Sequence, residues 1–137
     1  MQLRVSRAPL RGSVGVWLRA AAGLSLLAGL IHFAVAPEHF AEAFDEGAFM
    51  VIAGVAQVVT AFLLLRRPST ALIMLIVAGT MALFVLFGLA YTIGLPVGPH
   101  PWQPEPLGSM VVFSKATELL LLITLAEASR GWLIRGV

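Results

Sequence analysis

The 137-residue chain contains no cysteine. This absence excludes disulfide bonds, thiolate metal ligands, cysteine-bound iron–sulfur clusters and cysteine nucleophiles. Charge is also scarce, because Asp, Glu, Lys and Arg make up 12% of the residues, whereas a soluble domain carries roughly 25%. Apolar residues account for 59%, and the mean hydropathy is +0.94. A chain this apolar cannot build a water-facing surface, so we expect one domain surrounded by lipid.

Nucleotide-binding and hydrolytic motifs are missing as well. The sequence has no Walker loop, no GxGxxG, no HExxH and no serine nucleophile motif, and this favours a protein that is not an enzyme. The net charge of +2 and the pI near 9.9 could suggest a nucleic-acid partner. The arginines gather near the ends of apolar runs, however, where they act as signals of membrane topology. We therefore expect a lipid bilayer as the partner and no nucleic acid.

Four long apolar runs are present, and about 20 such residues cross a bilayer core as a helix. They cover about residues 16–36, 48–65, 71–93 and 109–127. The runs are continuous rather than alternating, which argues against membrane strands. The first is longer than the apolar part of a signal peptide, about 7–15 residues, so we interpret it as a retained span. The sequence predicts an all-α, polytopic membrane protein built as an antiparallel bundle of four transmembrane helices.

Basic residues gather on one side of these spans. They are Arg4, Arg7, Arg11 and Arg19 at span one, Arg66 and Arg67 between spans two and three, and Arg130 and Arg135 after span four. The two opposite loops, residues 37–47 and 94–108, contain no Lys or Arg. The positive-inside rule then places the N- and C-termini in the cytoplasm and both acidic loops outside.

The two outer loops differ in composition. Pro37 can begin a helix, and the residues after it would form a short amphipathic interfacial helix. Its apolar face would carry Phe40 and Phe44, and its polar face would carry Glu38, Glu42 and Asp45. Residues 94–108 hold five prolines, each of which fixes φ and removes a hydrogen-bond donor. We expect this second loop to be a stiff, extended lid without a helix.

Polar side chains inside a span need a partner or a function. Those in or near the outer half of the spans are His32, Gln57, Tyr91, Lys115 and Glu118. We take these five as the ligand- or ion-binding candidates. Lys115 and Glu118 are three residues apart and share a helix face. Either they form a structural ion pair that lowers the cost of insertion, or Glu118 is an ion or proton site that Lys115 tunes.

A metal site is a further hypothesis. All three histidines fall on the outer side, and we group His32, His39 and His100 with Glu38 as ligands for a divalent ion. Three imidazoles and a carboxylate would suit Cu(II) or Zn(II). The competing interpretation is a hydrogen-bonded interfacial histidine beside a solvated acidic face.

One resemblance extends from about residue 24 to 125. Its matching points are His32, the "APEHF" segment, Gln57, the "RRPS" turn, the "GPH" loop and Glu118. In these features the chain resembles a group of small, uncharacterised four-helix membrane proteins of bacteria that have no established activity. The resemblance implies a multi-pass protein of the bacterial cytoplasmic (inner) membrane, and it implies nothing about chemistry.

Three functional hypotheses remain open. In the first, a polar, His- and Glu-containing site opens to the outer face and binds or moves a cation, a transition metal or a small polar ligand. In the second, the chain is a non-catalytic accessory subunit of a larger membrane complex, or assembles with copies of itself. A third, weaker hypothesis is a redox protein associated with haem or quinone; a single histidine inside the spans argues against bis-histidine haem.

Overall fold

The computed structural model describes residues 12–133 and is all-helical apart from its connections. Four helices follow one another: α1 (Ser13–Glu42), α2 (Phe44–Arg66), α3 (Thr70–Thr92) and α4 (Ser109–Leu133). Each is long and apolar enough to cross a membrane. This confirms the expectation of four apolar helices and is compatible with a multi-pass membrane protein. Arg4, Arg7, Arg11 and Arg135, on which the topology prediction partly rests, lie outside the described residues.

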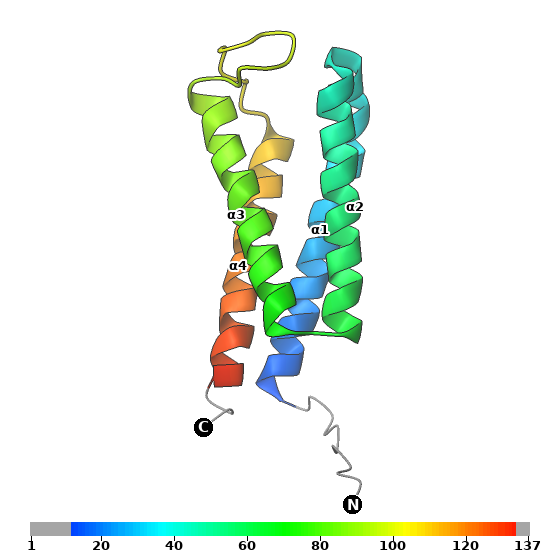
Figure 1. Cartoon of the computed structure of the whole chain (residues 1–137), viewed down its shortest axis with the longest axis vertical. Coiled ribbons are helices and arrows are strands. Elements are labelled where there is room, and N and C mark those ends of the chain that lie inside the picture. The colour runs from blue at the N-terminus through cyan, green and yellow to red at the C-terminus, as the bar shows by residue number, and fades with distance from the viewer. Residues whose placement is uncertain (1–11, 134–137) are drawn as a thin grey trace, which may run out of the picture.

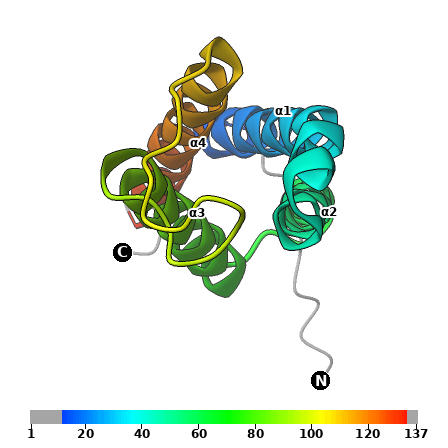
Figure 2. The ribbon, with the colours of Figure 1, turned by 90° about the horizontal axis from the view of Figure 1, so that it is seen from above.

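Successive helices run in alternating directions, and seen from above they form a ring in the order α1, α2, α3, α4 (Figures 1 and 2). Residues 93–108 lie at one end, called the loop end below, and the short α2–α3 turn lies at the other, called the turn end. Helix α1 packs closely against α2 and α4, whereas α3 contacts its two neighbours sparsely. The packing is therefore asymmetric, with α1 as the central helix.

Glycine allows α1 and α2 to approach closely. A β-carbon on Gly29 would lie 2.8 Å from the carbonyl oxygen of Gly54 and 3.0 Å from Val58. A β-carbon on Gly54 would in turn meet the ring of Phe33 at 2.7 Å. Small residues at a helix interface are a recurrent feature of membrane bundles, because association there depends on close van der Waals packing.

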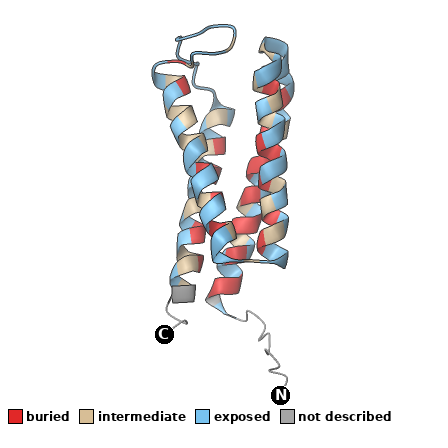
Figure 3. Cartoon of the chain, viewed as in Figure 1, coloured by how far each residue is buried: buried red, intermediate tan, exposed pale blue. Residues whose placement is uncertain are grey.

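The closely packed core lies toward the turn end. Its buried members include Leu18 and Ala22 of α1, Leu64 of α2, Ile73 of α3 and Leu125 of α4. Away from this core, large apolar side chains are exposed over the outer faces of the helices (Figure 3). Such extensive exposed apolar surface is unusual for a soluble monomer and is what lipid contact requires.

The predicted interfacial helix after the first span is wrong. Helix α1 continues through Pro37 to Glu42, and the chain reverses at Ala43, whose backbone is extended. A proline inside a helix removes one backbone hydrogen bond, but a helix that is held by neighbours on both sides tolerates this loss. Helix α2 then begins at Phe44 with Asp45 and Glu46 in its first turn, where carboxylates complement the helix dipole.

The loop of residues 93–108 contains no helix, as expected, but it folds back instead of extending. The amide of Trp102 donates to the carbonyl of Leu95 at 2.8 Å, and the amide of Glu105 donates to the carbonyl of Ala90 at 3.0 Å. Gly98 has φ +90°, a backbone conformation that favours glycine. A β-carbon there would meet the carboxylate of Glu46 and would require that side chain to shift, so the loop lies against the start of α2.

Candidate functional site

A cavity of about 440 Å³ occupies the loop end of the bundle. All four helices and the loop of residues 93–108 contribute to its lining, and most of the wall is apolar. This size falls in the range of about 300–1,000 Å³ that is typical of small-molecule sites. The loop-end cavity is therefore the candidate functional site.

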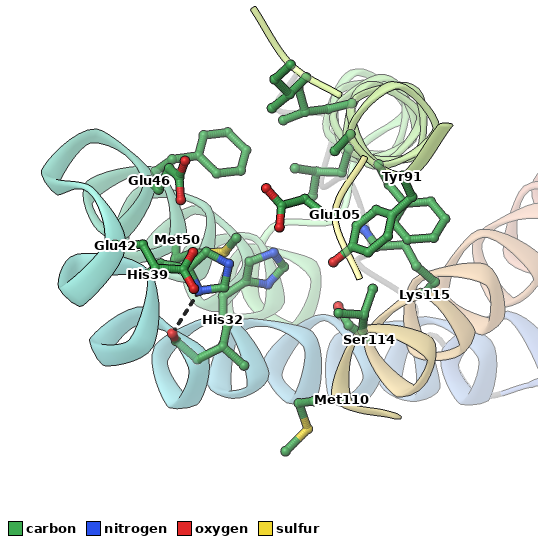
Figure 4. Close-up of a pocket in the computed structure, with 18 of the residues that line it drawn as sticks. His32, His39, Glu42, Glu46, Met50, Tyr91, Glu105, Met110, Ser114 and Lys115 are labelled. Carbon is green, nitrogen blue, oxygen red and sulfur yellow. Dashed lines mark hydrogen bonds between the residues drawn. The ribbon is translucent and has the colours of Figure 1, made fainter. Parts of the chain in front are cut away.

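Four carboxylates line this cavity: Glu42 at the end of α1, Asp45 and Glu46 at the start of α2, and Glu105 in the loop. The reversal of the chain at Ala43 brings the first three together, and the fold-back of the loop adds the fourth. Figure 4 shows Glu42 and Glu46 on one side of the cavity, with Glu105 and Tyr91 across from them. The mouth therefore gathers negative charge from segments about 60 residues apart in the sequence.

Two histidines on one face of α1 project into the cavity. His32 and His39 are seven residues, or two helical turns, apart, and both line it. Each ring places Nδ1 2.9 Å from a backbone carbonyl oxygen, that of Ala28 for His32 and that of Val35 for His39. A carbonyl only accepts, so Nδ1 carries the proton, and the Nε2 of the neutral ring is left as a hydrogen-bond acceptor.

Among the residues that the structure describes, Lys115 is the only lysine or arginine in the cavity lining, and its charge is already paired. Its ammonium donates to Oε2 of Glu118 at 2.5 Å, and Glu118 is fully buried. The ammonium also lies 5.3 and 5.5 Å from the ring centroids of Phe84 and Phe87, within the distance of a cation–π interaction. Lys115 consequently adds little net positive charge to the site.

Gln57 extends this ion pair deeper into the bundle. Its Nε2 donates to Oε1 of Glu118 at 3.3 Å, so both carboxylate oxygens have partners. Oε1 of Gln57 is buried without a hydrogen-bond partner. Ser25 and Thr60 donate to the backbone carbonyl of Gln57 at 2.8 and 3.0 Å and do not satisfy the amide oxygen. An orphaned buried acceptor is costly, and it marks this position as open to a donor.

The structure divides the five predicted ligand-binding residues into two connected groups. His32, Tyr91 and Lys115 line the cavity. Gln57 and Glu118 form a buried hydrogen-bonded layer beneath them, and the ion pair of Lys115 with Glu118 connects this layer to the cavity. Their roles in binding stay predictions. The sequence-based choice left out the carboxylates Glu42, Asp45, Glu46 and Glu105. Their placement in two loops without basic residues was the signal that could have included them.

The predicted metal set does not come together. Within residues 12–133, no group of three or more His, Cys, Asp or Glu side chains is placed to hold a metal ion. Glu38 and His100 are both exposed and outside the cavity lining. Glu38 follows Pro37 on a different face of α1 from His32 and His39, because neighbouring residues on a helix differ in direction by about 100°. A Cu(II) or Zn(II) site from these four residues is not formed in this structure.

Comparison with protein-family models, curated proteins and solved structures gives no match.

Proposed function

We propose that this chain is a small integral membrane protein whose loop-end cavity opens to the outer face and binds a cation. In this proposal the four helices form an antiparallel bundle in the cytoplasmic membrane of a bacterium. Arg66 and Arg67 lie exposed at the turn end, and the positive-inside rule supports a cytoplasmic position for that end. Both termini would then also be cytoplasmic.

One observation carries the proposal: four carboxylates line a cavity whose single lysine is neutralised by Glu118. Unlike charges 4 Å apart attract by about 4 kcal/mol at an effective dielectric constant near 20, compared with about 1 kcal/mol in water. The low-dielectric walls focus this field on whatever enters. A cation gains from this arrangement, whereas an anion would be repelled.

The lining also favours one kind of cation. Three aromatic side chains, Phe49, Phe87 and Tyr91, belong to the wall, and aromatic faces stabilise organic cations. A transition metal ion would need a close cluster of donors, which the described residues lack. An organic ammonium ion therefore fits the site better than a metal ion.

A second candidate function is that of an accessory subunit. Helix α3 contacts its neighbours sparsely, and its small residues Ala78 and Ala82 are exposed. A helix of a partner or of a second copy could pack there. A stoichiometric partner that co-purifies and contacts α3 would support this function. A protein that purifies in mild detergent as a monomer, with no partner on α3, would contradict it.

Calorimetric titration with ethylammonium chloride tests the cation site. We expect saturable binding to the purified protein and a loss of affinity of about tenfold, or ~1.4 kcal/mol, in the double variant Glu46→Gln/Glu105→Gln. Glu38→Gln is the matched control, because this substitution removes the same type of charge from an exposed position outside the cavity. Equal weakening by the control and by the double variant would contradict a defined site.

A further inference from the structure

A second cavity lies beside the first, between α2 and α3. It has a volume of about 330 Å³, and its wall is almost entirely apolar. It exists because α3 stands away from α2 along much of its length and the two helices contact each other sparsely. We call this second cavity the lateral groove.

The lateral groove adjoins the loop-end cavity. Phe49 of α2 and Leu83 of α3 line both, so these two side chains form the boundary between them. The two spaces are therefore adjacent on the α2–α3 side of the bundle, and we refer to them together as the path. A molecule longer than the loop-end cavity could extend past Phe49 and Leu83 into the groove.

The groove also reaches the surface that faces lipid. Ile52 and Leu75 line it and are 68% and 66% exposed. The two ends of the path consequently have opposite chemistry. The loop end offers carboxylates and histidine acceptors, while the far end is apolar and open toward hydrocarbon.

We infer that the loop-end cavity and the lateral groove together bind one single-chain alkylamine. This inference rests on the proposed cation site and identifies the class of cation. The ammonium group would lie among Glu42, Glu46 and Glu105, and the hydrocarbon chain would pass Phe49 and Leu83 into the groove.

The histidines select the type of amine. In the neutral rings, Nε2 of His32 and of His39 are acceptors, because each Nδ1 donates to a backbone carbonyl. A primary ammonium has N–H groups to donate to them, whereas a quaternary ammonium has none. The structure therefore predicts that a primary amine binds more tightly than its trimethylated counterpart of equal chain length.

Photolabelling locates the chain of the ligand. The probe is dodecylamine with a diazirine at the end of its chain, added to the full-length protein in phosphatidylcholine vesicles. A second probe carries a hydroxyl in place of the ammonium and reports insertion into lipid without recognition of the head. We expect the amine probe to label the groove, at or near Ile52 and Leu75, and the alcohol probe to label all lipid-facing surfaces alike. Excess ethylammonium should reduce the groove labelling by the amine.

Variants at the boundary test the path itself. Leu83→Trp should reduce groove labelling several-fold by filling the passage, and Leu83→Phe should do so less. Val85→Trp is the matched control, because Val85 is 59% exposed on the same helix and lines neither cavity. The comparison of the two probes on the wild-type protein needs no variant and decides the matter even if Leu83→Trp does not fold.

Two failures would be distinguishable. If ethylammonium binds in a carboxylate-dependent way but both probes label the same surfaces, the alkylamine inference is wrong and the cation site stands. If ethylammonium neither binds nor competes, the cation site is wrong and the inference falls with it. A third probe, the trimethylated counterpart of the amine probe, tests the histidines, and tighter binding of it than of the primary amine would overturn the role assigned to them.

Discussion

At the scale of single residues, the site depends on how its few polar groups are satisfied. Glu118 has partners on both oxygens, the two histidines are each fixed through Nδ1, and Gln57 retains an unsatisfied Oε1. A buried ion pair contributes little net stability when it is complete, but removing one partner leaves a buried charge. The ion pair therefore holds Lys115 in place and neutralises its charge, so that the carboxylates determine the negative charge of the cavity.

Lys115→Met tests this reading of the ion pair. Because Glu118 is fully buried, the variant should lose about 3–5 kcal/mol of stability, measured as the free energy of unfolding in mixed micelles. The double variant Lys115→Met/Glu118→Leu should recover most of that loss. An equal loss in the single and double variants would contradict the pairing as the cause.

The sequence alone identified some of these residues but not their contacts. His32, Lys115 and Glu118 were identified because a polar side chain inside an apolar run is costly unless it has a partner or a function. The link from Glu118 to Gln57 spans 61 positions and depends on how α2 and α4 face each other through the bundle, which no spacing along the chain encodes. The carboxylates at the mouth were visible in the sequence, but their convergence depends on the reversal at Ala43 and on the folded loop.

At the scale of elements, two glycines set how closely segments approach. Gly29 places α1 against α2, and Gly98 places the loop against Glu46. The sequence predicted the four helices because long apolar runs dominate the pattern. It was wrong about Pro37, since packing of α1 between α2 and α4 outweighs the loss of one hydrogen bond.

Gly29→Ala should destabilise the protein by about 1–3 kcal/mol, the usual cost of overpacking, because the added carbon would lie 2.8 Å from the Gly54 carbonyl. Gly23→Ala on the same helix meets nothing within 4 Å and should be neutral or slightly stabilising. Thermal unfolding of both variants in one detergent measures the difference. Similar melting temperatures for the two variants would argue against the close α1–α2 contact.

Gly98→Ala should move the loop away from α2, because alanine is disfavoured at φ +90° and its β-carbon would meet Glu46. The absence of native cysteine makes a single reporter possible. Val97→Cys should react faster with a soluble maleimide when combined with Gly98→Ala, and at an unchanged rate when combined with Gly108→Ala, where a β-carbon meets open space. An unchanged rate with Gly98→Ala would mean that this glycine does not hold the loop.

At the scale of the whole molecule, the bundle is closely packed at the turn end and hollow at the loop end. The turn end contains the buried cluster around Leu18, Leu64 and Leu125. The loop end contains the cavity of about 440 Å³. The sequence could indicate the charge difference between the ends but not the cavity, because its volume depends on the spacing of α3 from the other helices.

The proposed orientation can be measured with the same cysteine-free background. His100→Cys in the loop should react with an impermeant maleimide added outside intact cells, and Arg67→Cys in the turn should react only after the membrane is opened. Both positions are exposed, so a difference reports the side of the membrane rather than burial. If only Arg67→Cys reacts in intact cells, the orientation is opposite to the one proposed and the cavity opens toward the cytoplasm.

Equilibrium dialysis of radiolabelled ethylammonium against the purified protein tests the cation site most directly, because it counts bound molecules. We predict one bound ethylammonium per chain, with the affinity lowered about tenfold by Glu46→Gln/Glu105→Gln and unchanged by Glu38→Gln. Binding that never saturates, or saturable binding that survives loss of both cavity carboxylates, would contradict it.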